Sequence, residues 1–122
     1  IDAGETPVIN GDGSQAYDFV YVEDVARANV LALKSASTDA FYNVGTGVQT
    51  SVSRLCETIL RLKESSLEVK YEPYSEVDER RLVKNRIGST QRAEKEIGFR
   101  YRYDLETGLR KLIHWRDTGK IS

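Results

Sequence analysis

The 122-residue sequence contains no methionine, one cysteine, one histidine and two prolines. A single cysteine cannot form an internal disulfide, and one histidine is too few for a metal site of the usual zinc spacing. No apolar run approaches the about 20 residues that span a bilayer, and no secretory signal pattern opens the chain. The 18 basic and 19 acidic residues leave a net charge of −1, which disfavours a large nucleic-acid surface. We therefore expect a cytoplasmic protein that binds no metal, no membrane and no nucleic acid.

The missing methionine also bears on where the chain comes from. The sequence starts at Ile1, a bulky residue after which an initiator methionine is not normally removed, and residues 1–7 look like the end of a helix running into a loop. We expect a fragment of a longer chain, and the alternative is an ordinary start that was removed with a tag. With 39% hydrophobic residues, the chain can bury one modest core, which suits one domain.

The first third of the chain has clear local patterns. Residues 7–9 and 17–22 are rich in β-branched or aromatic residues and are expected to form strands, separated by two Asx-Gly pairs at residues 10–13 that predict a turn. Residues 25–33 follow with apolar side chains at helical spacing, and Asp24 is the expected N-cap.

The rest of the chain alternates in the same way. The expected elements are a strand at 40–44, a helix capped by Thr50 or Ser51, a half-buried strand at 67–72, a charged loop at 74–89 with a short extended piece at 82–83, a helix from Ser89 or Thr90 to Gly98, and a last helix capped by Asp104. The sequence therefore predicts a small α/β domain of short strands and about four helices.

Four motifs together suggest a family. Residues 7–26 read Pro-x-Ile-x-Gly-Asp-Gly-x-Gln-x-x-Asp-Phe-Val-Tyr-Val-x-Asp-Val-Ala, and residues 42–47 read Tyr-Asn-Val-Gly-Thr-Gly. Ala-x-x-x-Ile-Gly-Phe at 93–99 and Leu-x-x-Gly-Leu at 105–109 follow in order. The pattern resembles the C-terminal, substrate-binding part of extended short-chain dehydrogenases/reductases. These are the NAD-dependent nucleotide-sugar epimerases and dehydratases, which include UDP-glucose 4-epimerases.

The resemblance also implies what the chain lacks. In this family the N-terminal lobe binds NAD on a Rossmann fold and supplies a catalytic Tyr-x-x-x-Lys pair. None of the seven tyrosines here is followed by lysine four residues later. We therefore expect residues 1–122 to be the C-terminal lobe of an extended enzyme without its Rossmann lobe. Such a lobe would have no catalytic residue and no NAD site of its own and would be inactive alone, while the parent would be an NAD-dependent isomerase, a UDP-sugar 4-epimerase.

The same resemblance assigns a binding role to the Gly-Asp-Gly segment. The nucleoside-diphosphate sugar would lie against Asn10, Gly11, Gln15, Tyr17 and Phe19. The family usually has arginine at the position of Tyr17, just before Asp-Phe, so this chain lacks a cation there. Tyr17 could stack on a ring or hydrogen-bond a phosphate, and the alternative is a surface tyrosine without a binding role.

A second family arginine lies in the loop before the Ala93 helix, usually in Arg-x-Gly-Asp. Taking Asp78 as the family aspartate puts Ser75 at the arginine position, whereas counting back from Ala93 puts Arg80 and Arg81 near it. We prefer the second alignment, because it keeps a guanidinium where a diphosphate would lie. The alternative is that both arginines are solvated and face neighbouring glutamates.

Two functions stay open. The chain is either the nucleotide-sugar-binding lobe of a larger enzyme or a stand-alone, non-catalytic remnant that acts as a binding or oligomerisation module. In both cases the apolar surface that the Rossmann lobe would cover is exposed, which predicts a homo-oligomer through that face. A Gly-rich motif and a Tyr-x-x-x-Lys pair in frame before Ile1 would identify a fragment.

Overall fold

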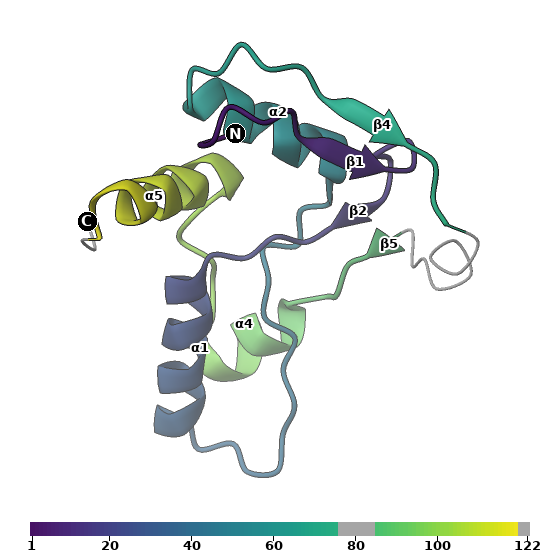
Figure 1. Ribbon diagram of the computed structural model, residues 1–122. Helices are drawn as coiled ribbons and strands as arrows, with labels where there is room; N and C mark the ends of the chain where they lie inside the picture. The colour runs from purple at the N-terminus through teal and green to yellow at the C-terminus, as the bar shows by residue number, and fades with distance from the viewer. Residues whose placement is uncertain (76–84, 120–122) are drawn as a thin grey trace. The chain divides into compact units, whose positions relative to one another are not determined.

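The computed structural model describes residues 1–75 and 85–119. They form four helices and five short strands in the order β1, β2, α1, β3, α2, β4, β5, α4 and α5 (Figure 1). The chain divides into two compact units. The first combines Ile1–Tyr17 with Gln49–Arg86, and the second combines Asp18–Val48 with Ile87–Ser122. The predicted α/β class with about four helices is confirmed.

A two-stranded parallel sheet opens the first unit. β1 (Val8–Asn10) pairs with β4 (Lys70–Glu72), and Ile9 lies opposite Tyr71. Ile9 is buried, as the alternation of a half-buried strand requires, whereas every residue of β4 is exposed. The half-buried strand expected at 67–72 differs in two ways, since the observed strand begins at Lys70 and all three of its residues are exposed.

A three-stranded sheet completes the strands of this unit. β2 (Ala16–Tyr17) is the central strand, antiparallel to β3 (Thr50–Ser51) and parallel to β5 (Asn85–Arg86). Successive side chains of a strand point to opposite faces of the sheet. β2 therefore places Ala16 in the core and Tyr17 on the opposite, half-exposed face.

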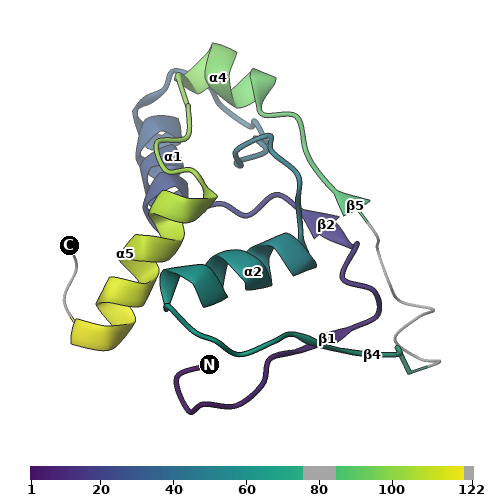
Figure 2. The same cartoon turned by 90° about the horizontal axis from the view of Figure 1, so that it is seen from above.

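Helix α2 (Val52–Leu62) lies alongside β1 and β4 in the first unit (Figures 1 and 2). The hydroxyl of Ser51 accepts a hydrogen bond from the N–H of Arg54, which confirms the expected cap. Leu60 is buried on the apolar stripe of the helix, and Thr58 is buried with its hydroxyl donating to the Arg54 carbonyl at 2.8 Å. The local sequence thus fixes both the start and the buried face of α2.

The second unit has a core of small side chains. Helix α1 (Val22–Lys34) contributes Ala28, and the short helix α4 (Gln91–Ile97) contributes Ala93, both almost completely buried. Phe99 is the largest side chain in this cluster. Alanine at both helix surfaces allows a close approach of their backbones, and Phe99 and Ile97 fill the remaining space.

Helix α5 (Leu105–Thr118) follows the core segment. Asp104 accepts a hydrogen bond from the N–H of Thr107 at 2.8 Å, which confirms the second expected cap. Gly108 is buried against Tyr21, and a Cβ at this glycine would come within 3.2 Å of the tyrosine side chain. None of the helices in the described ranges has the length and hydrophobicity needed to cross a membrane.

Asp24 does not cap α1, so that expectation is wrong. The N-cap residue is Tyr21 and no side chain caps the helix. The Asp24 carboxylate is completely buried and accepts hydrogen bonds from the N–H of Arg102 (2.9 and 3.0 Å) and of Tyr103 (3.1 Å). The Arg27 guanidinium donates to it at 2.6 Å. Asp24 therefore fastens the segment before α5 to the first turn of α1.

The charge state of Asp24 follows from this environment. Burial raises the pKa of a carboxyl group, but the hydrogen bonds from Arg27, Arg102 and Tyr103 outweigh burial, so the pKa of Asp24 lies below its ordinary value of 3.8. The carboxylate is therefore ionised at neutral pH, and hydrogen bonds from Arg27, Arg102 and Tyr103 stabilise its negative charge.

Two expected strands differ from the structure. Of residues 17–22, only Tyr17 belongs to a strand, and Val22 already starts α1. Residues 40–44 form no strand, because no ladder partner lies beside them among the described residues, and Tyr42 and Val44 pack on the core instead. The extended piece expected at 82–83 lies outside the described residues, and the nearby strand β5 was missed.

We predict that Asp24→Asn lowers the free energy of unfolding by about 3 kcal/mol at pH 7, because the buried donors lose an ionised acceptor. The stabilisation exists above the pKa of aspartate in the unfolded chain and disappears as the pH falls through the lower pKa of the folded state. Urea denaturation from pH 7 to pH 2.5 should therefore show the difference between wild type and variant shrinking in acid.

The control is Asp39→Asn, an exposed aspartate with a positive φ of 54° that asparagine also tolerates. Its unfolding free energy should stay within about 0.5 kcal/mol of wild type. A pH-independent loss in the Asp24 variant would contradict the assignment of an ionised, hydrogen-bonded carboxylate.

Candidate functional site

The candidate binding segment is the tight turn between β1 and β2. Asn10 ends β1, and its carbonyl accepts a hydrogen bond from the Gln15 side-chain amide at 3.3 Å. Inside the turn, the Asp12 carboxylate accepts from the N–H of Ser14 at 2.9 Å and from its hydroxyl at 2.6 Å. The turn predicted from the two Asx-Gly pairs is therefore confirmed as a closed, internally bonded loop.

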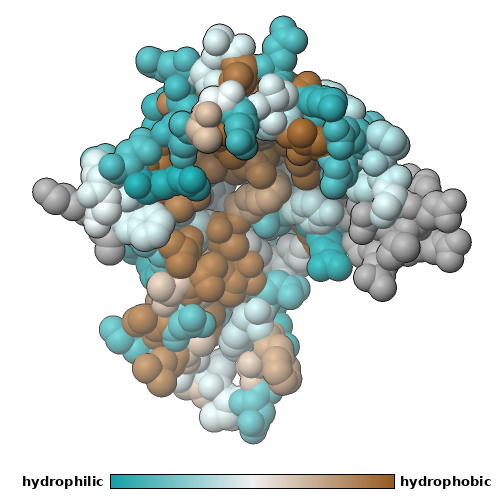
Figure 3. Space-filling model, in the orientation of Figure 1, coloured by the Kyte–Doolittle hydropathy of each residue, from teal (hydrophilic) through white to brown (hydrophobic). Residues whose placement is uncertain are grey.

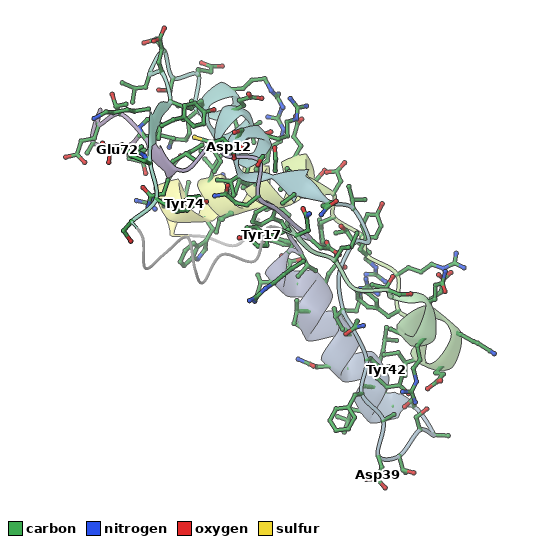
Figure 4. All side chains as sticks on the ribbon, turned by 90° about the vertical axis from the view of Figure 1, so that its right-hand side faces the viewer. Asp12, Tyr17, Asp39, Tyr42, Glu72 and Tyr74 are labelled. Atoms are coloured by element: carbon green, nitrogen blue, oxygen red, sulfur yellow. The ribbon has the colours of Figure 1, made fainter. Side chains whose placement is uncertain are left out.

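Glycine at position 11 is required by its surroundings. Its φ is +82°, its N–H donates to the Glu72 carbonyl at 2.6 Å, and a Cβ would lie 2.1 Å from Cε2 of Tyr74. Glu72 and Tyr74 thus lie beside the turn that contains Asp12 (Figure 4). The ring of Tyr74 forms one wall of the candidate site, a role that the sequence analysis did not foresee.

The N-terminus of α2 faces this turn, and its first N–H groups already have hydrogen-bond acceptors within the chain. The N–H of Val52 donates to the Gln15 carbonyl at 2.9 Å, and the N–H of Ser53 donates to the Gly13 carbonyl at 3.1 Å. The next N–H is capped by Ser51. A helix N-terminus often binds anions through these donors, but here the protein's own carbonyls and a hydroxyl occupy them.

Tyr17 lies in the middle of a row of hydrogen-bond donors. It pairs with Thr50 on β3 and with Arg86 on β5, so the register puts these three residues on the same face of the sheet. Tyr17 and Thr50 are half-buried, and Arg86 is exposed. A phenol, a hydroxyl and a guanidinium next to one another can together bind an oxyanion.

Phe19 belongs to the second unit rather than the first, so the structure describes it apart from the turn. It is half-buried there. The other expected contacts, Arg80 and Arg81, lie outside the described residues. Of the expected site residues, the structure brings together Asn10, Gly11, Gln15 and Tyr17 in the first unit.

The Gly-Thr-Gly turn at 45–47 has an internal partner. The Asp18 carboxylate accepts from the N–H of Thr46 (2.9 and 3.0 Å), from its hydroxyl (2.6 Å) and from the N–H of Gly47 (2.8 Å). A Cβ at Gly45 would lie 2.3 Å from Oδ2 of Asp18. The donors that could cradle a phosphate in this turn are thus directed at a carboxylate of the same chain.

The position of Arg86 beside Tyr17, like that of Tyr74, does not follow from the sequence patterns. Arg86 was placed in the charged loop at 74–89, because the stretch has no clear periodicity. Its position beside Tyr17 comes from a two-residue ladder between segments almost 70 residues apart. The only local signal was the extended piece expected at 82–83, and extending it by a few residues would have reached Asn85 and Arg86.

Comparison with known proteins identifies the fold and its relatives. The family model of GDP-mannose 4,6 dehydratase matches residues 1–112. A putative UDP-glucose 4-epimerase of Methanocaldococcus jannaschii is 34% identical over 111 residues, covering 91% of this chain and 34% of the relative. The chain belongs to this family of NAD-dependent epimerases and dehydratases. The resemblance stated from the sequence is confirmed.

Two solved structures of the family superpose well. The UDP-glucose 4-epimerase of Thermotoga maritima, solved with UDP-glucose, has a TM-score of 0.84 and 32% identity, covering 97% of this chain and 37% of its own. The Bordetella bronchiseptica enzyme WbmF, solved with NAD+ and UDP, has a TM-score of 0.77 and 28% identity, covering 96% of this chain and 33% of its own. The chain thus spans about a third of the length of the relatives that it matches.

The described residues do not form a binding site for the NAD with which longer family members were solved. A dinucleotide needs a Gly-rich turn with free N–H groups that leads into a helix N-terminus. Here Asp18 closes the Gly-Thr-Gly turn, and the first N–H groups of α2 are bonded to the 10–15 turn or capped. Neither place leaves donors for a pyrophosphate.

We predict that Gly11→Ala destabilises the protein by about 1–3 kcal/mol more than Gly47→Ala. Both glycines have a positive φ, +82° and +72°, but a Cβ meets Tyr74 only at Gly11 and nothing within 4 Å at Gly47. The Gly47 variant thus measures the backbone cost alone, about 1 kcal/mol.

Thermal or urea denaturation of both variants gives the comparison. In a double-mutant cycle, Gly11→Ala should cost less in a Tyr74→Ala background than in the wild type, because the ring no longer blocks the new methyl group. Equal losses at Gly11 and Gly47, or the same cost of Gly11→Ala in both backgrounds, would contradict the contact between the turn and the ring.

Proposed function

We propose that this chain is the nucleotide-sugar-binding lobe, residues 1–122, of an NAD-dependent sugar-nucleotide epimerase or dehydratase, without the Rossmann lobe. The observation that supports it most directly is the closed turn at residues 10–15, with Tyr17 directly after it, in a chain of this family. The parent would be a UDP-sugar 4-epimerase, because relatives named UDP-glucose 4-epimerase match most of this chain.

In the proposed complex the chain orients the substrate and does no chemistry. Asn10, Gly11 and Gln15 would contact the nucleoside, and Tyr17 would contact a ring or a phosphate. Arg80 and Arg81 would supply cations for the diphosphate. The NAD-binding lobe would carry the catalytic tyrosine and lysine, so this chain alone would be inactive.

We predict saturable binding of UDP and UDP-glucose to the purified chain, measured by calorimetry or by amide shifts in NMR spectra, with no response to NAD. Arg80→Ala/Arg81→Ala should weaken UDP binding at least about tenfold, since charge-assisted hydrogen bonds to phosphate are lost. An NAD response equal to that of UDP, or UDP binding that is unchanged in the double variant, would contradict the assignment.

A second function, self-association, is favoured by the surface of α1. The exposed apolar residues of this helix recur at steps of four, four and three residues: Val22, Ala26, Val30 and Leu33. Leu33 is 86% exposed, and Phe41, in the segment after the helix, is 90% exposed. Hydrophobic side chains cover much of the α1 face that Figure 3 displays. Such stripes are typical of surfaces that bind another chain.

The proposed occupant is a second copy of the chain, packed antiparallel along α1. The stripe itself carries no charge, while Glu23 lies near the start of the helix and Lys34 at its end. An antiparallel pair puts each acidic start beside a basic end and also aligns the helix dipoles favourably. The chain would then be a homo-oligomer, and a stand-alone, non-catalytic module of this kind is the alternative to the enzyme lobe.

We predict that sedimentation of the chain at tens of micromolar shows a dimer that Val30→Glu dissociates, raising the dissociation constant at least about tenfold, because a charge would enter an apolar interface. Leu112→Glu on α5 is the matched control, since Leu112 and Val30 are both 48% exposed helical residues. A monomeric wild type, or equal effects of the two substitutions, would refute self-association through α1.

A further inference from the structure

The β3–β2–β5 sheet has two chemically different faces. Ala16, Ser51 and Asn85 share one face, where Ala16 is buried and the Asn85 side chain accepts from the Gln49 amide at 2.9 Å. Because side chains alternate, the next residue of each strand lies on the opposite face. That face carries Thr50, Tyr17 and Arg86 in a row, one from each strand.

The three side chains form a short line of hydrogen-bond donors without a carboxylate among them. Neighbouring strands lie about 4.8 Å apart, so the outer members of the row are about 10 Å apart. Thr50 and Arg86 can therefore reach an anion that lies over Tyr17 from both sides. The guanidinium supplies a planar pair of N–H groups, and the two hydroxyls add single donors.

The nearby helix N-terminus does not compete with this row for an anion. The N–H groups of the first turn of α2 are bonded to the Gln15 and Gly13 carbonyls and to Ser51. The 10–15 turn carries the Asp12 carboxylate, which is bonded to Ser14 and would repel an anion. Arg86 lies next to Tyr17 in the ladder and brings a positive charge to the row.

We propose that Arg86, with Tyr17 and Thr50, binds the diphosphate of the nucleotide ligand, and that Arg86 carries the positive charge that position 17 lacks in this chain. The guanidinium has moved by one strand across the sheet, from β2 to β5, while staying on the same face. This inference rests on the proposed nucleotide-sugar binding and adds a residue that the alignment of motifs does not identify.

The test is a titration of the full chain with UDP, with uridine as the ligand that lacks phosphate. Arg86→Gln should raise the Kd for UDP at least about tenfold and leave the weaker uridine response unchanged. Arg54→Gln is the matched control, an exposed arginine of the same unit that pairs with Glu57 at 3.8 Å, and it should stay within about twofold of wild type.

A compensating variant tests the geometry rather than the charge alone. Tyr17→Arg added to Arg86→Gln returns a guanidinium to the same face and should restore UDP binding to within about threefold of wild type. Gln49→Arg adds the same charge just before β3, on the face that carries Asn85 rather than Arg86, and should restore nothing. Restoration by both substitutions would reduce the effect to nonspecific attraction and overturn the inference.

A second ligand shows whether Arg86 recognises the diphosphate or another anionic group of the ligand. UDP-glucuronate carries a carboxylate on the sugar as well as the diphosphate, and UDP-glucose carries only the diphosphate. Equal losses for both in Arg86→Gln support the diphosphate, and a loss confined to UDP-glucuronate overturns that assignment. UDP binding that Arg86→Gln leaves intact overturns this inference alone, whereas no UDP binding by the wild-type chain overturns the proposed function itself.

Discussion

The second unit depends on a carboxylate that is completely removed from water. An isolated ionised group in such a position is strongly unfavourable, so its donors must be in place whenever the unit is folded. Asp24 takes those donors from Arg27 on its own helix and from the backbone of Arg102 and Tyr103, 78 and 79 residues further along. The start of α5 is thereby fixed to the start of α1, and the Tyr103 hydroxyl, which donates to Glu23 at 2.8 Å, supports the same junction.

Asp18 is a second carboxylate that is held by hydrogen-bond donors of the same chain, in this case the donors of a loop. Successive N–H groups of a glycine-rich turn converge on one point and attract an anion, which in many proteins is a phosphate. Here the anion is the Asp18 side chain, held by two N–H groups and the Thr46 hydroxyl. The Gly-x-Gly pattern therefore has a structural role in this chain, and the proposed diphosphate contacts lie instead on the face of the sheet that carries Tyr17.

Features that depend on a few neighbouring residues were predictable from the sequence. The turn at 10–13, the caps at Ser51 and Asp104 and the left-handed end of α4 at Gly98 are of this kind, because their partners lie within a few positions. Asp24 was read as a cap, since its donors beyond Arg27 lie some 80 residues away. β5 and the missing strand at 40–44 were misjudged for the same reason: a strand exists only where another segment supplies its ladder. Of the candidate site, the turn could be foreseen, but Tyr74 and Arg86 reach it only through folding.

The proposed position of the cation on β5 couples binding to folding. A two-residue strand contributes few hydrogen bonds, so the pairing of β2 and β5 adds little stability by itself. An anion held by Tyr17 and Arg86 together bridges the two strands and binds best when they are paired. By mass action, such a ligand stabilises the paired state by RT ln(1 + L/Kd), where L is the free ligand concentration. A guanidinium on the central strand β2 would not need this pairing to reach the anion, so moving the charge to β5 makes the formation of the sheet part of ligand recognition.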